Sequence, residues 1–485
     1  MSGPRIETLR ERVLGWLLSW AFVPPVVVER EEQGVRQHMI VIGSSGVAVK
    51  VHVRAESGPE RRIPLFAPRR SEKTAYFGFG HRHMRNSDYR EYLQVITSHL
   101  KNEFARGRCD KGVMIVIHGG MQPPRETVPV SVELYKRIQE DGYYPIFINW
   151  DSSLRRAYLQ QLFLIHSGLY GLPAGWRSPF YFVAYLVWAF FYGVADVGRS
   201  VALLVPGLLI YLRLLWRSSR FYEYPTMLDL DRFKTPKVKL GDWRPELGAL
   251  RMLRNVVATP IQALALLCMG TITPRAWENL LRRTRAMFRA PKEFDWNRPP
   301  DGAAYGDCEG AMAVFLRELA AALPDCPGME VTLLSYSMGS MIANEAVQYR
   351  SGLPYKALVY LAPACYVRRF ADAFNTLEAK EDKPEAYVLT LHPRVEAGQR
   401  DFGVFGGSVL EWLEELLATP HTYVDRVLGR WDNALHTLHL YEHARDHLHF
   451  KCFPYPVEGS KWPRKHTDFY RPDLDPPFWR REFWW

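Results

Sequence analysis

The sequence is poor in cysteine, with six among 485 residues. The cysteines stand at positions 109, 268, 308, 326, 365 and 452, and no two of them have a CxxC or other zinc-binding spacing. Their pattern gives no indication of a structural zinc site or a disulfide framework. We therefore predict reduced, mostly buried thiols in a protein of the cytosol.

The sequence also lacks a secretory signal and a comfortable membrane span near its start. The apolar run at residues 13–28 contains Pro24 and Pro25 and has 16 residues, whereas a spanning helix needs about 20. Acidic residues precede the run, and no small-residue cleavage site follows it. We predict an interfacial or packing helix here.

No zinc-finger or RNA-binding signature is present, although the net charge is +10. Residues 151–300 hold 21 basic and 10 acidic side chains, and the rest of the chain is close to neutral. The same region has the longest apolar runs. This combination favours a partner with an anionic membrane surface over nucleic acid, and a solvated basic surface is the alternative.

Hydrophobic residues make up 47% of the chain and charged residues 24%, which is typical of a folded protein. Strand and helix patterns alternate along much of it. Residues 112–120 are predicted to form a buried strand, 130–142 an amphipathic helix closed by Gly142, and 143–151 a second strand. The order strand, helix, strand predicts a parallel pair with a right-handed crossover.

The alternation stops after residue 151 and resumes with a helix at 306–323. A strand and a helix follow at 331–347, more strands at 357–365, 386–393 and 447–455, and more helices near 369–379, 408–418 and 433–446. We predict an α/β fold with a doubly wound, mostly parallel sheet and one large helical insertion. The predicted divisions are 1–110 (with a strand pair at 39–53 and a helix at 89–104), 111–152, 153–300 for the insertion, and 301–485.

The sequence SYSMG at residues 335–339 predicts an abrupt corner between a strand and a helix. Such corners store backbone strain where a side chain must be aimed. The corner resembles the G-x-S-x-G nucleophile elbow of the α/β-hydrolase family, with Ser335 in place of the first glycine. The resemblance covers residues 110–153 and 300–470, and it implies that Ser337 is a nucleophile.

The same resemblance implies an oxyanion hole and a base. The sequence VIHGG at residues 116–120 matches the turn that supplies a backbone donor, so Gly120 or Met121 would donate from one side and Met338 from the other. His118 is expected to be a turn residue. His466 follows the last predicted strand, where the family keeps its base.

The triad acid has three candidates. Glu396 is favoured because it follows the strand at 386–393, after which the family places its acid, and Asp401 and Asp425 are the alternatives. Histidines 436, 439, 443 and 447 are spaced to share one helix face, which either binds metal or carries ordinary surface histidines. A hydrolase with such a triad is expected to need neither a metal nor an organic cofactor.

The insertion resembles the cap that selects substrate in this family. Its apolar runs at 179–195 and 201–216 flank Asp196 and Arg199, which predicts two short helices with a hinge, and a third run lies at 256–274. They either meet a lipid surface or pack on the core. The expected function is a serine ester hydrolase of the carboxylesterase or lipase type, acting on a lipid-like or long-chain ester. Acyl transfer by the same triad and an inactive membrane-associated scaffold are the alternatives.

Overall fold

The fold was examined in a computed structural model of the chain. It describes residues 22–23, 26–44, 46–53, 63–64, 68–69, 76–77, 84, 86–154, 156–158, 165–166, 169–170, 180, 183–184, 186–188, 190–191, 276–289, 309–349, 351–378, 383–399, 407–414, 422–437, 440–441, 446–453 and 461–485. The predicted apolar runs at 201–216 and 256–274 and the alternative acid Asp401 lie outside the described residues.

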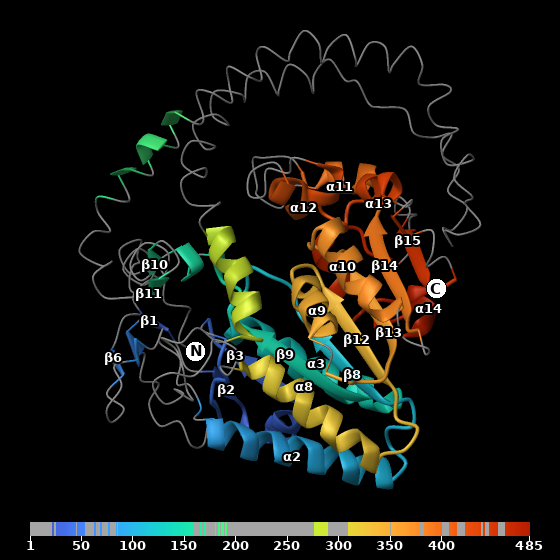
Figure 1. The fold of residues 1–485 in the computed structure, drawn as a ribbon. Helices are drawn as coiled ribbons and strands as arrows, with labels where there is room; N and C mark the ends of the chain where they lie inside the picture. Colours follow the sequence, from blue (N-terminus) through green and yellow to red (C-terminus); the bar gives the residue numbers. More distant parts are fainter. Residues whose placement is uncertain are drawn as a thin grey trace, which may run out of the picture. The chain divides into compact units, whose positions relative to one another are not determined.

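Seven strands form one mostly parallel sheet, so the predicted α/β class is confirmed. Across the sheet the order is β15 (Leu448–Phe453), β14 (Glu385–Leu391), β13 (Tyr355–Leu361), β12 (Val331–Tyr336), β8 (Val113–Ile117), β9 (Tyr144–Trp150) and β3 (Met39–Ile42) (Figure 1). The pairs β8 with β9 and β13 with β14 are parallel. All residues of β8 and β9 are buried, which explains why these strands have continuous apolar sequences.

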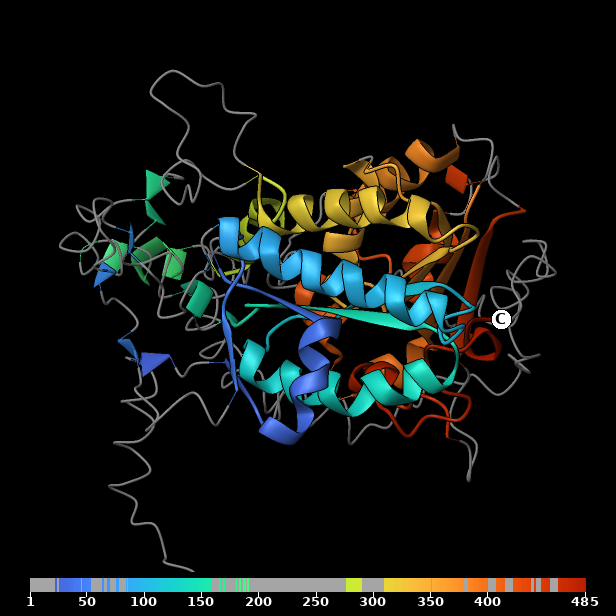
Figure 2. The same cartoon turned by 90° about the horizontal axis from the view of Figure 1, so that it is seen from below.

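The chain divides into two compact units, which are described separately. The first comprises residues 1–153, 282–333 and 345–355. Figure 2 shows α2 (Asn86–Ala105) and α8 (Ala311–Ala322) on one face of β9, with α3 (Pro124–Glu140) and η1 (Arg30–His38) on the other. The hydroxyl of Tyr89 on α2 donates to the carbonyl of Ala311 at 3.0 Å, which ties the two helices of one layer together.

The second unit comprises residues 154–281, 334–344 and 356–485. It contains β13, β14 and β15 together with α10 (Val367–Glu378) and the C-terminal α14 (Arg481–Trp484). The ring of Phe370 on α10 meets Tyr360 of β13 edge-on, with centroids 5.0 Å apart. Lys451 of β15 donates to the carbonyl of Phe483 at 2.6 Å, which fastens α14 beside the strand.

The predicted helix at residues 13–28 is wrong over its described part. Phe22–Val23 is β1 and Val26–Val28 is β2. Strand β2 pairs in parallel with β4 (Val51–Val53), and β3 pairs with β9. Within residues 39–53 the predicted strand pair is reduced to a short antiparallel bridge between Ile42 and Ala48, where the Val49 amide donates to the Val41 carbonyl at 2.8 Å. Proline breaks a helix and consecutive valines favour a strand, which accounts for the difference.

The predicted helix at 433–446 is also wrong in length. The helix α13 (Trp431–His436) ends at Thr437, and β15 begins at Leu448. His436 and His447 therefore do not share a helix face, and histidines 439 and 443 lie outside the described residues. Within the part of the chain that the structure describes, no group of His, Cys, Asp or Glu side chains is arranged to hold a metal ion.

Two further properties concern cysteines and membranes. Cysteines 109, 326, 365 and 452 are free and buried, which confirms the prediction of buried thiols for these four. Among the described helices, none combines the length and the apolar character that crossing a bilayer requires.

Candidate active site

The backbone at Ser337 has the strained corner that the sequence predicts. Ser337 lies between β12 and α9 (Gly339–Gln348) with φ at +49°, in the left-handed region that side chains other than glycine rarely adopt. Such a residue costs about 1–3 kcal/mol and persists only where its surroundings hold it. The Ser337 amide donates to Leu361 at 2.9 Å, and the Ala364 amide donates to the Ser337 carbonyl at 3.0 Å. The hydroxyl of Ser340 donates to the same carbonyl at 2.6 Å.

Ser335, which stands where the elbow motif has a glycine, is fully buried. Its hydroxyl donates to the carbonyl of Val359 on β13 at 3.2 Å. A buried hydroxyl is costly only when it lacks a partner. This hydrogen bond explains why a serine is accommodated at the corner.

The structure brings Ser337 and His466 together. His466 begins the short helix η10 (His466–Tyr470), and its Nε2 lies 2.8 Å from the Ser337 hydroxyl oxygen. The two side chains are 5% and 3% exposed, so little water competes for this contact. The distance is within the range for direct proton transfer between a nucleophile and a base.

Burial sets the charge of the imidazole. It lowers the pKa of His466 to about 4, so the ring is neutral at pH 7 and can accept a proton. If Nε2 accepts from the Ser337 hydroxyl, the proton of the neutral ring is on Nδ1. Among the described residues, Nδ1 of His466 has no hydrogen-bond partner. No described carboxylate therefore occupies the position of a triad acid.

The structure does not bring Glu396, the favoured acid, to the imidazole. Glu396 lies on α11 (Pro393–Gly398), and its carboxyl group interacts with Ser408, Arg430 and Glu411 instead. Burial, only partly offset by the charge of Arg430, raises the pKa of Glu396 to about 8. The carboxyl is therefore mostly protonated at neutral pH, which is unsuited to stabilising an imidazolium.

The alternative acid Asp425 has other partners. It ends η8 (Tyr423–Asp425), accepts a hydrogen bond from the Thr422 hydroxyl at 2.6 Å, and forms an ion pair with Arg368 at 3.1 Å. Its side chain is 34% exposed, unlike the buried imidazole of His466. Asp401 stays a prediction of the sequence.

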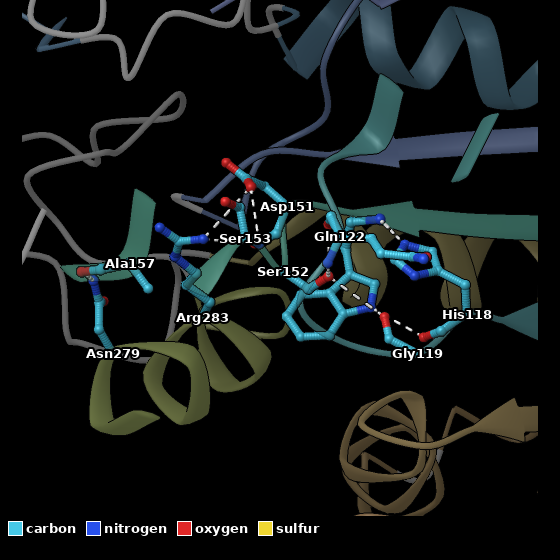
Figure 3. Close-up of polar contacts among 10 residues, drawn as sticks. His118, Gly119, Gln122, Asp151, Ser152, Ser153, Ala157, Asn279 and Arg283 are labelled. Carbon is cyan, nitrogen blue, oxygen red and sulfur yellow. Dashed lines mark hydrogen bonds and ion pairs between the residues drawn. The ribbon is translucent and has the colours of Figure 1, made fainter. Parts of the chain in front are cut away.

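The expected oxyanion donors Gly120 and Met121 lie in the first unit, after β8. The Met121 amide donates to the carbonyl of Ser152 at 3.0 Å, with Met121 at a φ of +67°. The hydroxyl of Ser152 donates to Gln122 at 2.7 Å, and Figure 3 shows Ser152 beside this loop. The Met121 amide is therefore already paired, and a donor role for Gly120 stays a prediction of the sequence.

His118 in the same loop has a structural partner. Its Nε2 accepts a hydrogen bond from the Trp150 amide at 2.9 Å, and its carbonyl accepts one from the Trp150 indole at 3.2 Å. Burial lowers the pKa of His118 to about 4. His118, which is labelled in Figure 3, thus connects the loop after β8 to Trp150, the last residue of β9.

Met338, the other expected donor, directly follows Ser337 in the second unit and is buried. Its amide lies at the start of α9, where backbone N–H groups have no partner within the helix. This amide is therefore placed to donate to an oxyanion formed at Ser337.

Two residues at the site were missed from the sequence. The His466 amide donates to the side-chain oxygen of Gln399 at 3.0 Å, and the hydroxyl of Tyr336 donates to the His466 carbonyl at 3.1 Å. Both residues bind main-chain atoms of the base, and main-chain partners leave no residue pattern. The sequence marks them only by position: Tyr336 lies inside SYSMG, and Gln399 lies between the candidate acids Glu396 and Asp401.

Comparisons with protein-family models, with curated proteins and with solved structures each found no match to this chain. Its function is therefore argued from the geometry of the site.

Proposed function

We propose that the protein is a serine hydrolase of carboxylic esters, built on an α/β-hydrolase type of sheet. The observation that carries the proposal is the 2.8 Å contact between Ser337 and His466, made by a serine held at a φ of +49°. A buried serine that serves packing alone can adopt ordinary backbone angles, so a strained φ calls for another reason. The strain at Ser337, whose hydroxyl faces a neutral imidazole, supports a nucleophile and its base.

The topology of the sheet supports the same proposal. Going along the chain, β9 is added on one side of β8, and β12 and its successors are added on the other. Ligands of open α/β sheets bind beyond the carboxyl ends of strands where the strand order reverses. Ser337 directly follows β12, one of the two strands at this reversal.

In the proposed reaction the Ser337 oxygen attacks the acyl carbonyl carbon while its proton passes to Nε2 of His466. The Met338 amide donates to the oxyanion of the tetrahedral intermediate. His466 returns the proton to the leaving alcohol, the ester bond breaks, and an acyl-enzyme remains. Water then gives one proton to His466 and attacks the acyl carbon. The bond from the acyl carbon to the Ser337 oxygen breaks, the acid leaves, and His466 returns its proton to Ser337.

Labelling with a fluorophosphonate probe tests the proposal. We expect the wild-type protein to be labelled at Ser337 and to hydrolyse p-nitrophenyl esters. The variant Ser337→Ala should show neither activity. A Ser131→Ala variant is the matched control, since Ser131 is a buried serine on α3 whose hydroxyl bonds Thr127 and Asn149. Equal labelling of wild type and Ser337→Ala would sink the proposal.

A second function, an inactive hydrolase-fold scaffold, is favoured by one observation. Nδ1 of His466 has no hydrogen-bond partner among the described residues, and an imidazole without a carboxylate partner is a weaker base. The same experiment separates the two functions, because a scaffold would leave Ser337 unlabelled in a correctly folded protein.

For the substrate we propose an ester with an apolar acyl chain that is presented at an anionic lipid surface. The described residues between 180 and 191 are apolar and exposed, with Phe180 70%, Trp188 67% and Phe191 64% accessible. Large apolar side chains exposed together indicate an interaction site. The basic excess of residues 151–300 complements anionic headgroups.

Sedimentation with vesicles tests this part of the proposal. We expect binding to phosphatidylserine vesicles that weakens in high salt, and a loss of binding in a Phe190→Ser, Phe191→Ser variant. A Val95→Ser variant is the control, because Val95 is an exposed apolar residue on α2. Wild-type protein that stays in the supernatant, or equal binding of all variants, would argue against a lipid surface as the partner.

A further inference from the structure

We propose that Tyr336 and Gln399 are positioning residues that fix the base His466 through its main chain, an inference that rests on the proposed function. Their hydrogen bonds reach the main chain of His466 and not its Nε2. Together they bind both polar groups of the His466 backbone. The side chain of His466 then has only two torsions left to set the direction of its imidazole.

The two hydrogen bonds to the His466 main chain come from two different elements, both of which precede His466 in the chain. Gln399, one residue past α11, accepts from the His466 amide at 3.0 Å. Tyr336, the last residue of β12, donates to the His466 carbonyl at 3.1 Å. The helix η10, which begins at His466, is therefore held by two elements that precede it by many residues.

The aromatic ring of Tyr336 adds a packing contact. Its centroid lies 5.3 Å from that of the imidazole, and it stacks on Tyr470 at 5.5 Å with an interplanar angle of 6°. Tyr470 in turn packs against Phe478 at 5.1 Å. Since Tyr336 directly precedes Ser337, one rigid corner carries the nucleophile and the residue that holds its base.

The imidazole of His466 needs to be held by other contacts, because its Nδ1 has no hydrogen-bond partner among the described residues. In a serine triad the acid holds the imidazole in the correct orientation, and no described residue bonds Nδ1 of His466. Gln399 is buried, with 7% of its surface exposed, so its hydrogen bond is shielded from competing water. Main-chain fixation and ring packing thus supply the orientation that the described carboxylates do not.

The test removes single contacts and compares them with a matched loss elsewhere. Tyr336→Phe deletes only the hydroxyl, and Gln399→Met deletes the acceptor at similar volume. Tyr360→Phe is the control, because the Tyr360 hydroxyl is buried and donates to Asn344 at 3.0 Å away from the base. We expect kcat to fall about 10- to 100-fold in the first two variants with KM nearly unchanged, since a misplaced base slows chemistry more than binding.

Gln399→Glu keeps an acceptor oxygen and should restore most of the activity that Gln399→Met loses. A second readout does not depend on turnover. Modification of His466 by diethyl pyrocarbonate, followed by mass spectrometry, should be faster in Tyr336→Phe and Gln399→Met than in wild type and Tyr360→Phe. Equal kcat and equal modification rates in Tyr336→Phe and Tyr360→Phe would overturn the inference. Failure of Ser337 labelling with a faster His466 modification would overturn the proposed function and leave the positioning role supported.

Discussion

Two buried histidines, one in each unit of the molecule, share their electrostatics and differ in their partners. His118 lies after β8 in the first unit, and His466 begins η10 in the second. Burial lowers the pKa of each to about 4. Yet Nε2 of His118 accepts from the Trp150 amide, whereas Nε2 of His466 faces the hydroxyl of Ser337. A perturbed pKa therefore marks both histidines, and only the partner separates them.

The difference in partner has a chemical consequence. A backbone amide does not give up its proton, so the bond from Trp150 to His118 holds two strand ends together and does nothing else. A serine hydroxyl can transfer its proton to an imidazole as it attacks a carbonyl. Strongly shifted pKa values are thus a weak guide to function until the atoms in contact are known.

The largest expected effect comes from deleting each histidine in turn. We expect His466→Ala to reduce kcat/KM for a p-nitrophenyl ester by about 10⁴-fold or more, as the loss of a triad base does. His118→Ala should instead lower the free energy of unfolding by about 1–3 kcal/mol, because it leaves the buried Trp150 amide without an acceptor. Esterase assays give the first effect and urea denaturation the second.

Activity per folded molecule, with the folded fraction taken from circular dichroism, is the control for both variants. An equal loss of activity per folded molecule in His118→Ala and His466→Ala would contradict the purely structural role of His118. Activity that persists in His466→Ala would show that another base serves Ser337.

Sequence reasoning paired Ser337 with His466, and the structure places the two side chains in contact. Ser337 directly follows β12, and His466 comes later in the chain than β15, the last strand of the sheet. Sequence reasoning favoured Glu396 for a reason that patterning cannot test: a position in a loop says nothing about the direction of a side chain. Glu396 in fact interacts with Ser408 and Arg430, and Gln399, three residues later, reaches the base. Which residue of this segment contacts His466 depended on tertiary contacts that the sequence does not show.

The secondary structure was likewise predicted well where the local sequence decides it and poorly where a pairing partner decides it. The buried strand β8 is apolar throughout and β12 begins with a mostly apolar run, and the positions of both were predicted to within a few residues. The apolar run at 13–28 was assigned to a helix, although residues 26–28 pair with β4. A short apolar run fits a helix or a strand equally well, and the pairing partner that decides between them is not visible in the run itself.

A smaller effect is expected from replacing the candidate triad acids, because no described carboxylate bonds Nδ1 of His466. Glu396→Gln and Asp425→Asn should each change kcat by less than about threefold, because neither side chain bonds the imidazole. Asp401→Asn should give the largest loss of the three. Asp401 is two residues from Gln399 in sequence, and Cα atoms two residues apart are separated by at most about 7 Å.

Esterase rates measured on the three variants in parallel, with Tm as the check on folding, decide this prediction. A loss above about 100-fold for Glu396→Gln at unchanged Tm would restore Glu396 as the acid. Small losses in all three would mean that His466 works without any of these carboxylates.

The smallest expected effect is a pH dependence, and it asks whether burial controls His466 as it does His118. A base must be unprotonated to act, so kcat/KM should decline on the acid side only as the pH falls through about 4. At pH 5 the rate should therefore stay within about twofold of its value at pH 7, whereas an imidazole with an ordinary pKa near 6.5 would lose about 30-fold.

Unfolding must be separated from titration, because both histidines have a folded pKa below the unfolded value near 6.5. The unfolded chain then binds more protons between pH 6.5 and 4, and stability falls as the pH is lowered through that window. Short assays after a pH jump, with circular dichroism recorded at each pH, distinguish the two causes. A decline in kcat/KM centred near pH 6.5 in a protein that stays folded would show that the imidazole of His466 is hydrated in solution, and the comparison of two equally buried histidines would no longer hold.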